Sequence, residues 1–211
     1  MIASIINMVQ QHVGQTTPSY NYTYIILFVG ITILSYIVQA NLKSKFEKYS
    51  KMPIGMTGHD VAVKMLHDNG IYDVKVTATR GMLTDHYNPV TKTVNLSEGV
   101  YASRSVAAAA VAAHECGHAV QHALGYGPLR MRSALVPVVN FASNIVQWVL
   151  LAGVIFFQAF PGLLWFGIAL FATTTLFSFI TLPVEVNAST RAISWLESAG
   201  VTDYQTRPMA I

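Results

Sequence analysis

Long apolar stretches of the chain predict helices that cross a membrane. The first, 24–40, holds 17 consecutive and mostly apolar residues, which span roughly 26 Å as a helix. The turn signal Phe160-Pro161-Gly162 divides a second apolar block, 137–182, into spans of about 137–159 and 163–182. We therefore expect one N-terminal span and, later in the chain, a transmembrane helical hairpin.

The segment between these stretches, 41–133, has the mixed polar and apolar pattern of a folded domain. Thr57 and Asp60 are spaced as a helix cap, and apolar residues then recur at helical spacing. Apolar and polar residues alternate further on, which predicts a small antiparallel sheet. The expected elements are a helix over 58–69, strands near 74–79, 83–87 and 90–96, and a helix from Ser103 or Ser105 to about Leu124. The expected fold class is an α-rich α+β membrane protein.

The composition agrees with a membrane protein and disfavours other classes. Apolar residues make up 53% of the 211 and charged residues only 11%, and the mean hydropathy is +0.44. Soluble domains carry about 25% charged residues, so an ordinary soluble fold and a disordered chain are both poor matches. The net charge of +3 comes from only 13 Lys and Arg, and four of these lie within 43–51, so we expect no nucleic-acid partner. The single Cys116 excludes an intramolecular disulfide.

The positions of the charges predict the orientation in the membrane. No Lys, Arg, Asp or Glu occurs in 1–42 or in 133–184, so the charges lie beside the spans. By the positive-inside rule, the segment 41–133 and the tail 183–211 face the cytoplasm, whereas residues 1–23 and the hairpin turn face outward. Residues 1–23 also place apolar side chains on one helical face, as in a short interfacial helix. The basic residues behind this inference are Lys43, Lys45, Lys48, Lys51, Arg130, Arg132 and Arg191.

The helix expected to end near Leu124 carries the pattern His-Glu-x-x-His at 114–118. His114 and His118 are four residues apart, so both imidazoles project from one helical face and can bind one zinc ion. Glu115 lies at the edge of that face, where its carboxylate can take a proton from a metal-bound water. The pattern is short, so its meaning depends on a third ligand.

Three sources of a third ligand can be compared. His122 lies about 12 Å from His114 along a straight helix, too far for one tetrahedral ion, and is better placed to support the site or to face a substrate. The longer three-histidine pattern needs glycine and histidine where this chain has Gln121 and Leu124. Glu185 remains, at the end of the hairpin that returns it to the side of the histidine helix. A glutamate at the end of a span is also commonly a solvated cap.

Five groups of residues give the chain a specific resemblance to a known family. They are Leu83-Thr-Asp-His-Tyr-Asn-Pro89, Val94-Asn-Leu-Ser97 with Val100-Tyr101, Ala110 to Gln121, Arg132 to Val138, and Leu182 to Ser189. Through them the chain resembles the bacterial membrane neutral zinc metallopeptidases called YugP-like. It is more distantly similar to the HtpX-like and CAAX prenyl protease group. The resemblance covers most of residues 24–197.

The resemblance implies a zincin-like (gluzincin) catalytic domain attached to about three transmembrane helices in the bacterial plasma membrane. It implies one Zn²⁺ per chain, with His114, His118 and Glu185 as ligands. The related group has an aspartate four residues after its glutamate, where this chain has Ser189. Asn187 and Ser189 are therefore the candidates to orient a ligand histidine.

The implied reaction is zinc-dependent hydrolysis of peptide bonds, with Glu115 as the general base that activates the zinc-bound water. The candidates to stabilise the oxyanion are His86, His122 and Arg191. Asp85 and His86 belong to an expected strand whose edge could pair with an extended peptide. We expect a peptide or membrane-protein substrate and contact with the lipid bilayer. The sequence leaves the cleavage preference and the oligomeric state open.

Two other kinds of membrane protein can also carry the His-Glu-x-x-His pattern. A site-2-type intramembrane protease places the pattern inside a membrane span and takes its third ligand from an Asp-Gly pair, which this chain lacks. A catalytically inactive zinc-binding membrane scaffold would keep the metal without needing Glu115. Replacement of Glu115 distinguishes this scaffold from a peptidase.

The expected spans make the protein an integral membrane protein. Membranes from cells that express the full chain should retain it after a wash in alkaline carbonate, because such a wash disrupts ionic contacts but does not extract apolar helices from lipid. Detergent should release it, and an immunoblot of pellet and supernatant measures both steps. Recovery in the carbonate supernatant would contradict the predicted spans.

Overall fold

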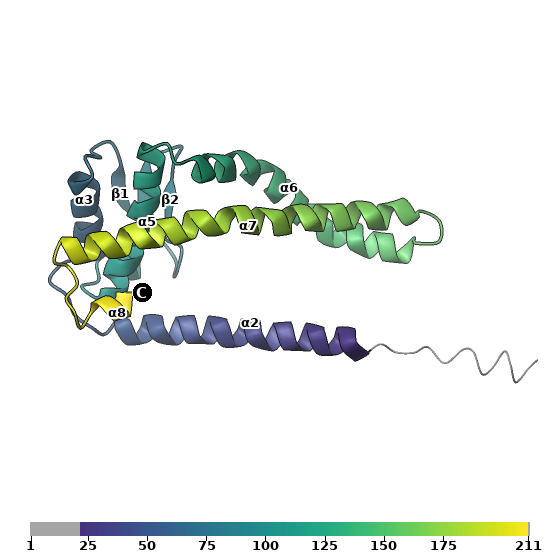
Figure 1. Ribbon diagram of the computed structural model, residues 1–211, viewed down its shortest axis with the longest axis horizontal. Helices are drawn as coiled ribbons and strands as arrows, with labels where there is room; N and C mark the ends of the chain where they lie inside the picture. The colour runs from purple at the N-terminus through teal and green to yellow at the C-terminus, as the bar shows by residue number, and fades with distance from the viewer. Residues whose placement is uncertain (1–21, 211) are drawn as a thin grey trace, which may run out of the picture. The chain divides into compact units, whose positions relative to one another are not determined.

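The computed structural model describes residues 22–210 (Figure 1). The chain divides into two compact units, Met1–Lys45 and Phe46–Ile211. The described residues of the first unit are helical and belong to α2 (Tyr22–Tyr49), whose apolar side chains, such as that of Phe28, are exposed. This helix agrees with the span expected at 24–40. The interfacial helix expected within 1–23 falls on residues 1–21, which lie outside the described part of the chain.

The second unit joins a small sheet and several short helices to a long helical hairpin. Its elements in chain order are α3 (Gly58–Asp68), β1 (Lys75–Thr79), β2 (His86–Asn88), β3 (Thr93–Ser97), α4 (Glu98–Tyr101), α5 (Val106–Ala123), α6 (Gly127–Ile155), α7 (Pro161–Ser198) and α8 (Arg207–Ala210). A mostly helical chain with one small sheet agrees with the expected α-rich α+β class.

The sheet is mixed, which corrects the expectation of an antiparallel sheet. β3 lies between the other two strands: β2 and β3 form an antiparallel hairpin, whereas β1 pairs with β3 in parallel. The direction of β1 differs because the segment 80–85 crosses the end of β3 instead of turning back beside it. Asp85 anchors this crossing, since its carboxylate accepts hydrogen bonds from Ser97 N and Oγ at 2.6 and 3.0 Å. Leu83 has a φ of 57°, outside the strand region, so β2 begins later than expected.

The core of the second unit lies between α3, α5 and the sheet. α3 begins with a capping box in which Thr57 and Asp60 exchange hydrogen bonds, as their spacing predicts. Small alanine side chains on α5 let this helix pack closely against its neighbours. The principal buried members of the core are Val61, Met65, Leu66, Val94, Leu96, Val100, Ala109, Ala112 and Ala113. This packing fixes α5, which carries both histidines of the pattern.

Helices α5 and α7 contact each other through their backbones at Gly117. A Cβ atom at Gly117 would lie 2.7 Å from the carbonyl oxygen of Ala188, closer than real side chains come, and 3.1 Å from its Cα. Ala188 is completely buried. Since Gly117 stands between the two histidines and Ala188 is three residues after Glu185, this contact sets how near the glutamate comes to the histidines.

The hairpin of α6 and α7 agrees with the two later spans. α6 ends at Ile155, and α7 begins with Pro161 in its first turn. α7 then continues to Ser198 without a break, although Pro183 lies inside it. Its 38 residues make a helix of roughly 57 Å, about twice the thickness of the hydrocarbon core, so its C-terminal part extends beyond a single span.

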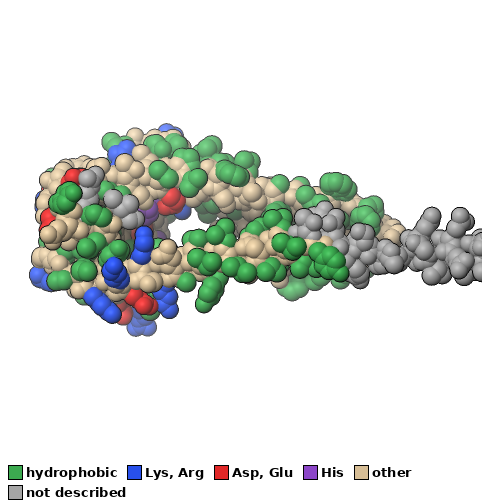
Figure 2. Space-filling model, turned by 60° about the horizontal axis from the view of Figure 1, so that its bottom comes forward, with side chains coloured by type: hydrophobic (Ala, Val, Ile, Leu, Met, Phe, Trp, Pro, Cys, Tyr) green, Lys and Arg blue, Asp and Glu red, His purple; other side chains and the backbone are tan. Residues whose placement is uncertain are grey.

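Within residues 22–210, three helices are long and apolar enough to cross a membrane: α2, α6 and α7. Residues 133–184 of the hairpin contain no Lys, Arg, Asp or Glu, and the acidic and basic side chains visible in Figure 2 lie at the end away from the hairpin turn. This distribution suits a hairpin in lipid attached to a domain in water.

Replacing Gly117 by alanine should destabilise the contact between α5 and α7. The added Cβ would meet backbone atoms of Ala188, which cannot move unless α7 shifts, so we expect a cost of about 1–3 kcal/mol, as for other overpacked sites. Thermal unfolding of the purified full chain in detergent, followed by circular dichroism, should give a lower midpoint than the wild type. Gly99→Ala is the matched control, because a Cβ at Gly99 in α4 meets nothing within 4 Å. Equal midpoints for the two variants would contradict the close contact.

Candidate metal centre

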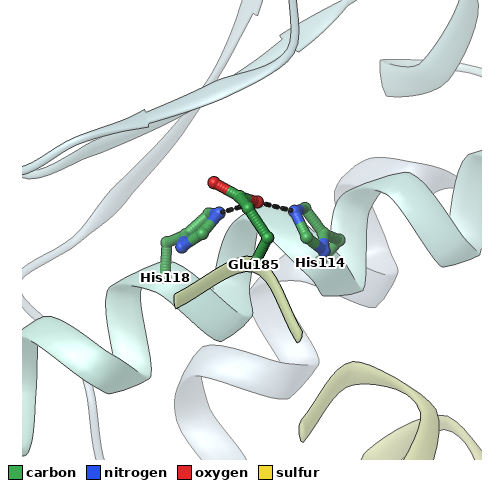
Figure 3. A group of neighbouring side chains, drawn as sticks. All are labelled: His114, His118 and Glu185. Atoms are coloured by element: carbon green, nitrogen blue, oxygen red, sulfur yellow. Dashed lines mark hydrogen bonds and ion pairs between the residues drawn. The ribbon is translucent and has the colours of Figure 1, made fainter. Parts of the chain in front are cut away.

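Two histidines of α5 and a glutamate of α7 converge at one point (Figure 3). His114 and His118 lie one turn apart on α5, with ring centroids separated by 4.8 Å and ring planes nearly perpendicular. Glu185 Oε2 lies 3.2 Å from His114 Nε2 and 3.3 Å from His118 Nε2. Potential ligand atoms of the three residues all lie within 4.8 Å of one another. The structure therefore brings together the three residues expected to bind the metal.

Hydrogen bonds on the far side of His118 determine which of its ring nitrogens faces the cluster. Gln121 Nε2 donates to Val184 O at 2.8 Å and to Asn187 Oδ1 at 3.0 Å, and these two bonds fix the orientation of the amide. Gln121 Oε1 therefore accepts a hydrogen bond from His118 Nδ1, at 3.1 Å. A neutral His118 then carries its lone pair on Nε2, toward Glu185.

His114 is held in a similar way by α7. Its Nδ1 lies 3.1 Å from Ser189 Oγ, so its Nε2 is the nitrogen that faces Glu185. Two imidazole nitrogens and a carboxylate oxygen that converge in this way favour a cation between them. Two histidines and one glutamate are also the donor set of a class of catalytic zinc sites. The residues present therefore fit a Zn²⁺ ion.

Glu115 lies beside this cluster without being part of it. Its Oε2 accepts a hydrogen bond from Tyr87 N at 3.0 Å, so α5 and β2 meet at this carboxylate. Burial raises the pKa of Glu115, although the neighbouring His114 and His118 act in the opposite direction. A carboxylate with a raised pKa accepts a proton more readily than an ordinary glutamate does.

A cavity of about 440 Å³ opens over the cluster. The three clustered residues and Glu115 form part of its wall, and Leu129, Arg132 and Val136 from α6 form another part. Arg132 Nη1 lies 3.2 Å from Glu185 Oε1, whereas the histidines contact Oε2. The arginine therefore holds one carboxylate oxygen and leaves the other to the histidines.

The three oxyanion candidates occupy different places. Among the described residues, His86 lines the cavity over the cluster, but His122 and Arg191 do not. His122 Nδ1 lies 2.7 Å from Tyr87 Oη, and Arg191 Nε donates to Asn187 Oδ1 at 2.8 Å. The structure thus brings only His86 of these three to the metal cavity within residues 22–210.

The remaining residues that the sequence suggested for the site, Asp85, Asn187 and Ser189, also lie near the cluster of His114, His118 and Glu185. Asp85 lines the same cavity, where its carboxylate is already bound to Ser97. Ser189 contacts a clustered histidine directly, whereas Asn187 acts through Gln121, whose amide it helps to orient. Ser189 and Asn187 therefore both belong to the hydrogen bonds around the ligand histidines, Ser189 in direct contact with His114 and Asn187 one residue removed from His118.

Gln121, Arg132 and Tyr87 are contributors that the sequence reasoning misses. The sequence reasoning assigns Gln121 no role at the site, although its place three residues after His118 puts it on the same helical face. Arg132 contributes to the predicted topology and to the family resemblance, but it is assigned no role at the site. Tyr87 contributes through its backbone N–H, for which the sequence holds no signal.

Cys116 takes no part in the centre. It is fully buried, and its Sγ donates to Ala62 O at 3.5 Å. Burial raises the pKa of this thiol, so it stays protonated and is a poor ligand or nucleophile.

Comparison with known proteins identifies the class. Residues 24–210 match the family described as "Putative neutral zinc metallopeptidase", and the chain belongs to this family. The chain is 47% identical over 180 residues to "Putative membrane protease YugP" of Bacillus subtilis (strain 168), a match that covers 82% of this chain and 79% of that protein. No solved structure matches the chain. The resemblance drawn from the five groups of residues is confirmed. The family agrees with zinc as the cofactor of the cluster, and the relative's name agrees with membrane association.

Replacing Gln121 by leucine should weaken zinc binding by about 10- to 100-fold, the usual effect of losing a residue that orients a ligand. The substitution removes the acceptor of His118 Nδ1, so the imidazole loses its fixed tautomer and orientation. Competition with a chromophoric zinc chelator, on the purified full chain in detergent, measures the affinity. Thr190→Val is the control, since the Thr190 hydroxyl donates to Val186 O within α7. If both variants bound zinc as the wild type does, the role of Gln121 would be refuted.

Proposed function

We propose that the protein is a membrane-bound, zinc-dependent metalloendopeptidase with a zincin-like (gluzincin) site. In this proposal His114, His118 and Glu185 bind one Zn²⁺ ion, and Glu115 is the general base. The observation that carries it is the convergence of Glu185 on the two imidazoles, with Glu115 at the edge of the cluster and outside the ligand group. Membership of a zinc metallopeptidase family supports it.

The chain's own residues divide the chemistry between them. When bound, zinc supplies a Lewis acid that lowers the pKa of a water molecule and polarises the scissile carbonyl. Glu115 takes a proton from the attacking water and delivers it to the leaving amine nitrogen. Arg132 and Gln121 keep Glu185 and His118 in the orientation that binding needs.

We propose that an extended peptide binds along β2. This strand is at the edge of the sheet, because the strand order is β1-β3-β2, and exposed strand edges pair with extended peptides. The contact between Tyr87 N and Glu115 Oε2 supports this placement, since a peptide on β2 would lie next to the proposed base. Asp85 and His86 line the cavity on this side.

We propose that the centre faces the cytoplasm from the bacterial plasma membrane. The basic residues beside the spans favour this orientation for the segments 41–133 and 183–211, with the hairpin turn outside. The substrates are then peptides or segments of membrane proteins that reach the cytoplasmic surface.

Glu115→Gln should abolish cleavage and retain zinc. The amide cannot accept the proton of the attacking water, so we expect kcat to fall by about 100- to 10,000-fold, whereas the three ligands are unchanged. Cleavage of casein and of quenched fluorogenic peptides measures activity, and mass spectrometry of the metal measures zinc content.

Two further variants complete this test. Glu98→Gln changes an exposed glutamate of α4 and should keep both activity and zinc, whereas Glu185→Ala should lose zinc. An active Glu115→Gln variant would exclude this residue as the base. A zinc-loaded wild type that cleaves no peptide would favour the inactive scaffold instead.

A further inference from the structure

A second cavity adjoins the proposed catalytic base, on the side of α5 that precedes His114. It encloses about 270 Å³ between α5, α7 and α8. His114 and Glu115 line both this cavity and the one over the metal cluster. The two cavities therefore share a part of their walls at the proposed base.

The wall of this second cavity is apolar. Apart from His114, Glu115 and Ser189, the described residues that line it are aliphatic: Ala110, Val111, Ala192, Ile193, Leu196 and Ala210. Ser189 is engaged with His114, and Glu115 with Tyr87. Among the described residues that line it, Lys and Arg are absent, and the polar groups are confined to the side of the proposed base.

Small side chains create the space. Ala110, Ala192 and Ala210 come from three different helices, α5, α7 and α8, and each contributes only a methyl group at a point where a larger residue would fill the cavity. Ile193 and Leu196 supply larger apolar surface. A cavity of about 150 Å³ lined by apolar side chains accepts benzene, so about 270 Å³ is enough for a leucine or phenylalanine side chain.

The second cavity lies next to the residues proposed to carry out the reaction. Val111 and Ala110 precede His114 by three and four residues, so on a helix they lie one turn from it on the same face. A peptide whose scissile bond lies beside Glu115 directs the neighbouring side chains into whatever space adjoins that carboxylate. One such space is the cavity over the cluster, and the second cavity is the other.

We propose that the cavity between α5, α7 and α8 is a specificity subsite that takes the apolar side chain of a residue flanking the scissile bond. The inference rests on the proposed peptidase function and adds a substrate class to it: peptides with an aliphatic residue or phenylalanine at that position. An aspartate side chain there would lose its hydration beside the Glu115 carboxylate, and a lysine side chain would pair with the carboxylate that the reaction needs as its base, so both are disfavoured in productive binding. Ala110 and Ile193 are then specificity-determining residues.

A degenerate peptide library tests this proposal. Zinc-loaded full chain in detergent is incubated with the library, and mass spectrometry identifies the cleaved bonds. At one of the two positions that flank the bond, leucine, isoleucine or phenylalanine should exceed aspartate and lysine by at least about tenfold in kcat/KM. The Glu115→Gln variant should bind single peptides with the same ranking, measured by fluorescence anisotropy, which separates binding from turnover.

Two variants of the wall should move this preference in opposite directions. Ala110→Leu fills the cavity and should lower kcat/KM by about tenfold for peptides with leucine or phenylalanine, but less than threefold for those with alanine. Ile193→Ala enlarges it and should favour bulkier residues. Ala123→Leu makes the same change as the first variant at an exposed position of α5, and should leave the preference unchanged.

The outcomes separate this inference from the proposed function. Cleavage by the wild type without an apolar preference at either position would overturn the subsite and leave the peptidase standing. An apolar preference that neither Ala110→Leu nor Ile193→Ala alters would also overturn the subsite. If Ala110→Leu does not fold, Ile193→Ala alone decides this outcome. A zinc-loaded wild type that cleaves nothing would overturn the function and the subsite together.

Discussion

The backbone contact between Gly117 and Ala188 is the constraint on which the rest of the centre depends. Because no side chain separates α5 from α7 at this point, polar groups of the two helices come within hydrogen-bonding distance on both sides of it. On one side Ser189 reaches His114, and on the other Gln121 reaches the backbone of Val184. The cluster of two imidazoles and a carboxylate follows from this packing, and not from the helix that carries the histidines alone.

The polar network around the cluster is fully connected, which makes it rigid. Gln121 uses its amide oxygen on His118 and its amide nitrogen on α7, and Arg132 occupies the oxygen of Glu185 that the histidines leave free. In the described part of the chain, no buried side-chain nitrogen or oxygen is left without a hydrogen-bond partner. Such satisfied networks hold their members in one arrangement, so little reorganisation is needed when a metal ion binds.

Periodicity and spacing were enough to predict α3, α5, the apolar spans and the pairing of His114 with His118, whereas Glu185 was one candidate for the third ligand and became the expected one through the family resemblance. Glu185 could be placed because a hairpin returns the chain to the level where it began. The direction of β1 could not be predicted, because it depends on a crossing segment that Asp85 anchors at the far end of β3. His122 continues the histidine series on α5, yet it contacts Tyr87, because β2 covers that part of the helix. Local pattern specifies the faces of a helix, whereas tertiary packing decides which partner each face meets.

The unbroken course of α7 through Pro183 ties the cluster mechanically to the lipid-facing part of the protein. Glu185 belongs to the same continuous helix as the apolar residues that follow Pro161, so a tilt or axial shift of that helix would move the carboxylate relative to the histidines. A fragment limited to residues 41–133 would keep both imidazoles and lack their carboxylate. The centre therefore depends on a residue that is carried by the same helix as the third candidate span, and it cannot be assembled without that helix.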